Sequence, residues 1–451
     1  MTSRLLRMGL AVTIGGCTAV SGLDQLEIAD DVTAGERDAS VIPPRDGAAP
    51  DDGSSELPPG PTGWAHRRPV TVVNDTSRAL ANHAVLVALP PSFGYEKASA
   101  DGADLRFSRH DNHADDLPYF IESWQPEGES LAWVLVPSVP PGTSSLQMFY
   151  GNGNVPAVSR FESVFPKAQR TAGGGAGSFT AAAKIEVDWF ELRAGDTLTL
   201  PAGAPLEIRA QRIIVAGSVE GDGRGHPGGE VGSLQGQGPG GGAAAADSSA
   251  SGGGGHGGAG GRGGADPGNT GGAGGAAHGG ESDAIVAIGS GGASSNAPAG
   301  FRQGGAGGGG VALFGWWTTV SGAIHVNGIA GQGGIGRNAG GGSGGGIVAA
   351  ACFLDLAGAS LQARGGAGGP CASSAHDGGG GGGGGRIKLH ARAEGRLIAA
   401  ASMDVASGAG GAGGGTTAPG IAGVVGSAHV NNESPALSGV VTSLGAETKG
   451  R

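Results

Sequence analysis

Between residues 63 and 166, short runs of alternating apolar and polar residues recur, separated by turn-forming Pro, Gly, Asp and Asn. The runs cover residues 70–73, 84–89, 104–107, 119–124, 131–136 and 146–150. Because alternation places every second side chain on one face of a strand, each run predicts a half-buried β-strand. Short strands at this spacing are typical of an antiparallel β-sandwich or jelly roll. We therefore expect an all-β domain over residues 63–166.

Residues 171–451 show a different pattern, in which apolar runs repeat and are joined by glycine-rich connections. Successive first strands of the repeat start near Val311, Ile347 and Ile387, which lie 36 and 40 residues apart. A repeat of this length predicts stacked units that share one core. Alternation within each run points small apolar residues inward. The pattern therefore predicts a β-solenoid.

A long insertion at about residues 222–309 interrupts this repeat, and glycine dominates it. The chain has 99 glycines in 451 residues, whereas a usual share is about 7%. From residue 252 to 265 the sequence reads Gly-Gly-X. In a polyglycine-II helix, which has three residues per turn, the two bare faces hydrogen-bond to neighbouring helices and X points outward. The same composition also suits a flexible linker, so the sequence leaves both interpretations open.

The N-terminus has the pattern of an export signal. Arg4 and Arg7 precede a short apolar stretch that ends at Cys17, and this stretch is too short to span a bilayer. Ile14-Gly15-Gly16-Cys17 resembles the bacterial lipobox. The resemblance implies that residues 1–17 form a lipoprotein signal and that Cys17 becomes the acylated membrane anchor, with Thr18 compatible with sorting to the outer membrane. The alternative is an ordinary secretory signal with an incidental cysteine.

Residues 18–62 are acidic and rich in proline. The formal net charge of the chain is −11, and ten acids against two arginines between Asp24 and Glu56 account for −8 of it. Such a segment buries too little apolar surface to fold by itself, so we expect a disordered tether. Because no clustered Lys/Arg face follows, nucleic acid is not an expected partner.

Five motifs within residues 64–152 resemble the bacterial domain-of-unknown-function family 2341. They are Trp64 with Arg67-Arg68, Asp104-Leu105-Arg106-Phe107, Leu117 to Trp124, Trp133-Val134-Leu135-Val136-Pro137, and Phe149-Tyr150-Gly151-Asn152. The resemblance implies a lectin-like, all-β sandwich in a secreted or surface protein. It implies no activity, since that family has no established catalytic residues.

Two tryptophans of this domain are candidate ligand-binding residues. An exposed indole ring can stack on the apolar face of a sugar. Trp64 and Trp124 lie at the ends of predicted strands, whereas Trp133 and Tyr119 lie inside alternating strands and are expected in the core. The alternative is that all of these rings are buried.

Metal and disulfide candidates are few. His110, His113 and Asp115 lie in a polar turn that could supply nitrogen and oxygen ligands, although exposed hairpins need such residues anyway. We therefore expect neither a metal nor another cofactor. Cys352 and Cys371 flank a glycine-rich loop and could form a disulfide in an oxidising compartment, or remain two thiols.

No Ser/His/Asp or paired-carboxylate arrangement stands out, and the many Gly-x-Gly-x-x-Gly matches follow from the abundance of glycine alone. We therefore expect a non-catalytic, surface-anchored lipoprotein with a binding or adhesive role in a Gram-negative envelope. Its expected partners are the membrane, through Cys17, and an envelope polysaccharide or surface protein. The alternatives are ice or crystal-surface binding by the polyglycine region, and a polysaccharide-active enzyme.

Overall fold

The computed structural model describes residues 63–449, except 111–115, 176, 181–182, 298–299, 373–375, 392–396, 399–400, 415–416, 432–439 and 445–447. The expected signal peptide, Cys17 and the tether lie outside the described residues. The fold is all-β, as predicted, with only a few short helical turns. The described residues form two compact units, which divide after Val164 and again before Val440.

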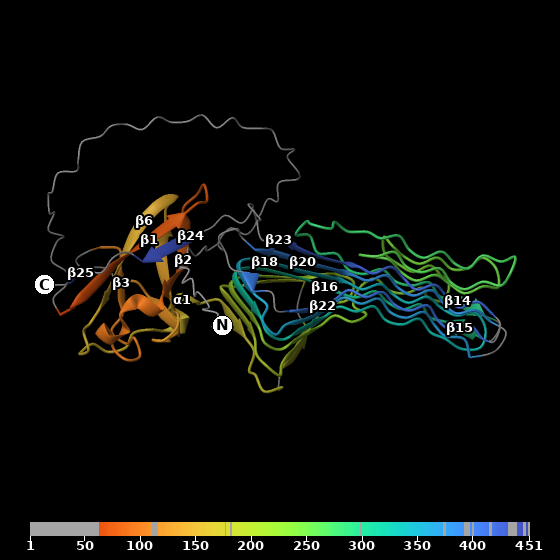
Figure 1. The fold of residues 1–451 in the computed structure, drawn as a ribbon, viewed down its shortest axis with the longest axis horizontal. Helices are drawn as coiled ribbons and strands as arrows, with labels where there is room; N and C mark the ends of the chain where they lie inside the picture. The colour runs from red at the N-terminus through yellow and green to blue at the C-terminus, as the bar shows by residue number, and fades with distance from the viewer. Residues whose placement is uncertain are drawn as a thin grey trace, which may run out of the picture. The chain divides into compact units, whose positions relative to one another are not determined.

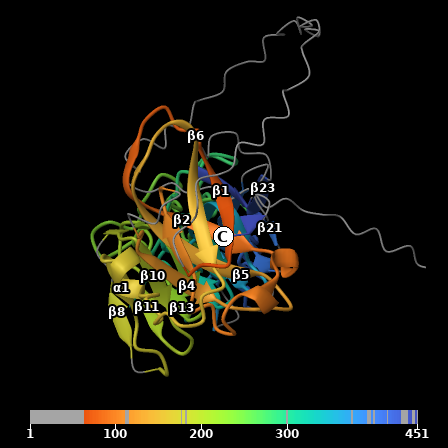
Figure 2. The same ribbon diagram turned by 90° about the vertical axis from the view of Figure 1, so that its left-hand side faces the viewer.

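The first unit is a sandwich of two antiparallel sheets (Figure 2). One sheet has the order β24-β1-β6-β3, and β25 also pairs with β1; the other has the order β2-β5-β4. The strands are β1 (His66–Asn74), β2 (Leu80–Leu89), β3 (Arg106–Ser108), β4 (Tyr119–Ser123), β5 (Ser130–Val139), β6 (Gly142–Tyr150), β24 (Val440–Leu444) and β25 (Thr448–Lys449). Alternate residues such as Val70, Val85 and Val134 meet in one core between the sheets. The helical turns are η2 (Pro91–Phe93), η3 (Tyr95–Lys97) and α1 (Phe161–Val164).

The sandwich is not continuous in sequence. β24 pairs antiparallel with β1 from Val70↔Leu444 to Asn74↔Val440, although more than 300 residues separate the two strands. The prediction that this terminal segment belongs to the glycine-rich region is therefore wrong, because the sequence of a single five-residue strand does not indicate its distant partner. The pairing covers an edge of β1 that the preceding strands leave open.

The second unit is a parallel β-solenoid, as the repeat predicts. One sheet has the order β23-β20-β18-β16-β12-β10-β7 and the other the order β22-β19-β17-β13-β11-β8. In the first sheet these are β7 (Ala168–Arg170), β10 (Trp189–Leu192), β12 (Leu206–Val215), β16 (Gly310–Val320), β18 (Gly346–Asp355), β20 (Arg386–Ala391) and β23 (Ser427–Asn431). In the second they are β8 (Ser178–Thr180), β11 (Thr197–Thr199), β13 (Ser218–Glu220), β17 (Ala323–His325), β19 (Ser360–Gln362) and β22 (Ser402–Asp404).

Small apolar residues stack in columns inside this solenoid. Ile208 pairs with Leu313, which is followed in the next coils by Ala349 and Leu389, and all four are fully buried or nearly so. Short strands complete the unit: β9 (Lys184–Glu186) pairs with β12, β21 (Leu397–Ile398) pairs with β18, and β14 (Ser295–Ala297) pairs with β15 (Gly300–Arg302).

The glycine-rich segments leave the strands and run side by side toward β14 and β15 (Figure 1). Gly379 and Gly382 donate backbone hydrogen bonds to segment 363–369, Gly380 and Gly383 to segment 251–254, and Gly381 and Gly384 to residues 421 and 424. Successive residues thus point to three different neighbours, and every third residue returns to the same one. This is the three-fold symmetry of polyglycine II. The region, insertion included, is therefore a hydrogen-bonded lattice rather than a flexible linker.

Segment 378–385 lies in the interior of this lattice. Besides donating to three neighbours, it accepts hydrogen bonds from three more, at residues 258–264, 341–344 and 408–411. With a neighbour on each of six sides, no direction remains for a side chain: a Cβ on Gly382 would overlap the carbonyl oxygen of Gly342. This close approach explains why residues 378–385 are eight consecutive glycines.

Candidate functional site

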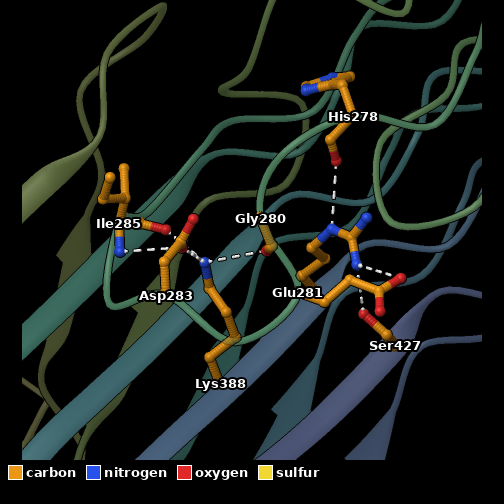
Figure 3. Close-up of polar contacts among 8 residues, drawn as sticks. His278, Gly280, Glu281, Asp283, Ile285, Lys388 and Ser427 are labelled. Atoms are coloured by element: carbon orange, nitrogen blue, oxygen red, sulfur yellow. Dashed lines mark hydrogen bonds and ion pairs between the residues drawn. The ribbon is translucent and has the colours of Figure 1, made fainter. Parts of the chain in front are cut away.

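A concentration of buried basic residues lies on the outer face of β20. Ile387 and Leu389 point into the solenoid core, so the alternating residues Arg386, Lys388 and His390 face the other way. All three are nevertheless at most 5% exposed. Residues 278–285 of the insertion bond to this face of the strand (Figure 3). A charged face of a sheet is thus covered by a loop from a distant part of the sequence.

Both cationic side chains are held by several oxygens of that loop. The Lys388 Nζ donates to Asp283 Oδ1 at 2.5 Å, to the carbonyl of Ile285 at 2.5 Å and to that of Gly280 at 3.3 Å. These three acceptors use all of its protons. A buried ammonium is stable only when it is paired and hydrogen-bonded in this way.

Arg386 donates hydrogen bonds both to the insertion and to the neighbouring strand β23. Its Nε donates to the carbonyl of His278 at 3.1 Å and its Nη1 to Ser427 Oγ at 2.7 Å, while Glu281 Oε1 lies 3.6 Å from Nη1 (Figure 3). The guanidinium therefore joins the insertion to β23 as well as to its own strand. We call the contact of Arg386 and Lys388 with residues 278–285 the clamp.

Histidines lie beside the clamp, inside the lattice. His256 is 1% exposed, and its Nδ1 lies 3.0 Å from the carbonyl oxygen of Gly344. The His256 ring is 4.8 Å from that of His278, whose Nε2 lies 2.9 Å from Ser290 Oγ. Burial lowers the pKa of His256 to about 3, and burial also lowers the pKa of His278 and His226. These imidazoles are therefore neutral near pH 7.

This arrangement fastens the insertion to the solenoid, since each cation donates to structural oxygens of the chain itself. Among the described residues, no group of three or more His, Cys, Asp or Glu side chains is placed to hold a metal ion. The clamp was not predicted from the sequence. Its one local sign is the alternation Arg386-Ile387-Lys388-Leu389-His390, in which every second residue of a buried strand is basic.

The two candidate tryptophans lie in different surroundings. Trp64 is 7% exposed, and the Arg106 guanidinium lies 5.5 Å from its ring centre. The prediction that the Trp64 ring is exposed for stacking on a ligand is therefore wrong, because the protein itself covers this ring. Trp124 is half-buried, and its ring lies edge-on to Tyr95 at 5.1 Å. Trp124 is therefore the less buried of the two candidates.

Trp133 and Tyr119 are both buried, as expected for rings inside strands. The Trp133 Nε1 donates to Glu122 Oε2 at 2.7 Å, which satisfies its polar atom.

The remaining candidates lie apart from these rings. His110 is exposed, and its backbone N–H donates to Ser108 Oγ at 3.1 Å. His113 and Asp115 lie outside the described residues, so the expectation that this turn holds no metal stays a prediction.

Both cysteines are described, and no disulfide joins them. Cys352 is buried in β18. Cys371 lies beyond segment 363–370, where its backbone forms an isolated β-bridge with Gly334. The chain between them runs outward along the lattice, and this separates the two thiols.

In the described part of the chain, no helix is long and apolar enough to cross a membrane. The fold defines the class: an all-β protein that joins an antiparallel sandwich to a parallel solenoid. Residues 101–169 match the family described as "Domain of unknown function (DUF2341)". The match covers β3 to β6 of the sandwich and begins after Trp64, Arg67 and Arg68. Comparison with curated proteins and with solved structures gives no match.

Proposed function

We propose that this protein is a non-catalytic lipoprotein of the bacterial cell envelope, with a structural and binding role. The observation that carries the proposal is the glycine lattice, in which backbone hydrogen bonds link each interior segment to its neighbours. A lattice of this kind is rigid and needs no reactive side chain, which suits a spacer or a load-bearing element. The sandwich is then the part that meets a partner.

The clamp supports the same role. Arg386 and Lys388 hold the insertion against the solenoid, so two buried cations of the second unit serve to keep the lattice in place. Anchoring rests on Cys17 and its lipobox-like sequence, followed by an acidic tether. Together these features support the proposal of a folded protein displayed at a membrane surface.

Fractionation of cells that produce the full chain tests the anchor. The wild-type protein is expected in the membrane fraction, and Cys17→Ala is expected to move it to the soluble exported fraction, because lipid is the only anchor proposed. Equal partition of both proteins would overturn the proposed attachment.

Trypsin tests the rigid lattice independently of the anchor. Arg262 is exposed, but its backbone carbonyl accepts a hydrogen bond from residue 421 within the lattice. A protease needs a locally unfolded segment, so the full chain is expected to resist cleavage at Arg262. Rapid cutting there under native conditions would show a flexible linker and remove the structural basis of the proposal.

Binding to a sugar would use Trp124, which is only partly buried. Co-sedimentation of the full chain with insoluble envelope polysaccharide, compared with Trp124→Ala, tests this part. Equal binding by both proteins would exclude the Trp124 site. Polysaccharide turnover, measured in the same samples, would instead favour an enzyme.

A second candidate, crystal-surface binding, is favoured by one exposed row of the lattice. Thr270, Ala273 and Ala276 are exposed at every third position of their segment. In a polyglycine-II helix such residues lie roughly 9 Å apart in line, which gives a flat row of small side chains. Thermal hysteresis of the purified full chain tests this function, and its absence would remove the candidate.

A further inference from the structure

The solenoid core is open at its last coil. Leu389 and Leu361 are at most 1% exposed, but the residues that follow them in their columns, Val430 in β23 and Met403 in β22, are 42% and 37% exposed. In the described residues, β23 pairs only with β20 and β22 only with β19. Two apolar core columns therefore end at the surface of the protein.

The lattice ends in the same coil with an apolar face. Gly420 and Gly423 donate to Gly411 and Gly408, so every third residue of segment 418–426 packs on its neighbour. The residues between these glycines include Ile421, Val424 and Val425, which are 57–60% exposed. Ala422 and Val425 make no backbone hydrogen bond to any described residue. We call Met403, Ile421, Val424, Val425 and Val430 the open end.

The first coil of the solenoid ends differently. The column of Phe190 and Ile213 begins with Gln169 in β7, next to Arg170, which pairs with Glu191 at 2.5 Å. A stack of repeats needs polar terminal coils to remain soluble. In this sheet the first coil begins the column with the polar Gln169, whereas the last coil ends a column with Val430. In the other sheet the first coil begins the column with Phe179. Head-to-tail stacking of two copies would therefore place an apolar residue against a polar one in the first sheet.

We propose that the open end docks against the open end of a second copy of this chain, across a two-fold axis. A two-fold contact pairs identical surfaces and closes after two subunits, so the apolar patch of each copy covers that of the other. It also brings the β23 edges together antiparallel, and antiparallel edges pair well.

The lattice already contains the geometry that this contact requires. Segment 418–426 runs antiparallel to segment 405–411, because Gly420 bonds to Gly411 while Gly423 bonds to Gly408. Its neighbour 258–264 is antiparallel as well, since residues 421 and 424 bond to Arg262 and Ala259. The unused N–H groups of Ala422 and Val425 recur every three residues. An antiparallel copy of the same segment carries the same period, which an unrelated surface does not.

Sedimentation velocity of the full chain tests the proposal, with Cys17→Ser in every sample to exclude association through lipid. The parent protein is expected to approach twice the chain mass as its concentration rises, and no more. The variant Val424→Asp/Val425→Asp is expected to sediment as a monomer, since it would bury unpaired carboxylates in the contact. Both residues are exposed, so circular dichroism should be unchanged.

Val231→Asp is the matched control, because Val231 is 80% exposed and lies outside the open end. It is expected to remain a dimer. A monomeric parent at every concentration would overturn the proposal and indicate that the chain's own residues cover the open end. A dimer that survives both aspartates, or a mass that keeps rising, would overturn it too. None of these outcomes bears on membrane attachment or on protease resistance, which test the proposed function separately.

Discussion

At the scale of single residues, Lys388 is the side chain on which the clamp most depends. It is 3% exposed and bonds to Asp283 and to two loop carbonyls. Lys388→Ala removes the ammonium donor from these oxygens, of which Asp283 Oδ1 keeps only the backbone N–H of Ile285, and this costs about 1–3 kcal/mol. We expect faster amide hydrogen exchange in residues 278–285 and a lower unfolding temperature. Lys184→Ala, at the exposed pair with Glu186, should cost at most about 1 kcal/mol; equal effects would contradict the clamp.

His256 predicts how the lattice responds to acid. Burial lowers its pKa to about 3, with smaller contributions from His278, Arg386 and Lys388. The unfolded chain binds a proton near the ordinary pKa of 6.5 and the folded chain does not, so stability falls as pH drops from 6.5 toward 3. His278, His226 and His390 shift in the same direction. The unfolding temperature should therefore decline between pH 7.5 and 5, and less steeply in His256→Gln. Parallel slopes would show that His256 does not contribute.

Sequence alone identified some individual residues and missed others for a physical reason. Trp133 and Tyr119 were predicted to be buried because strand alternation is local information. Lys388 was missed because its partner Asp283 lies 105 residues away, in a loop whose own sequence shows no structure. Trp64 was misjudged because its cover, Arg106, comes from another strand. The alternation along a strand predicts which face a side chain lies on, but not which distant residues pack against that face.

At the scale of elements, glycine content follows the number of neighbours. The interior segment 378–385 has six neighbours and consists of glycine throughout, whereas the last segment keeps glycine only at positions 420, 423 and 426. The Gly-Gly-X pattern could therefore predict the helix type and its bare faces. The pattern could not distinguish an ordered lattice from a flexible linker, because the order of each segment depends on hydrogen bonds to neighbouring segments from distant parts of the sequence.

Gly382→Ala tests this relation within the lattice. The new Cβ would overlap the carbonyl oxygen of Gly342, so neighbouring segments must move apart, at a cost of about 1–3 kcal/mol or more. Amide exchange should accelerate at residues 378–385 and in the segments bonded to them. Gly153→Ala is the control, since a Cβ there meets no atom within 4 Å. Unchanged exchange in Gly382→Ala would mean that the segments are not in contact.

At the scale of the whole molecule, the repeat predicted the solenoid and the alternating runs predicted the sandwich, because both are written in local periodicity. The return of the chain to the sandwich was not predictable in this way. β24 has five residues, and its antiparallel partner β1 lies at the opposite end of the described chain. Long-range pairing of a short strand leaves almost no trace in composition or spacing.

This return makes the sandwich depend on both ends of the chain. A fragment of residues 63–166 contains β1 to β6 but lacks β24, so the N–H and C=O groups of Val70–Asn74 that face β24 lose their partners. An open edge of this kind lowers stability and invites aggregation. The fragment should therefore unfold at lower urea concentration than the same fragment extended by residues 436–451 through a flexible linker, and it should elute partly as aggregates. A scrambled 436–451 extension is the control, because it adds length without the register of β24. If all three fragments have the same urea midpoint, β24 contributes nothing to the sandwich, and the first unit ends where its last local strand does.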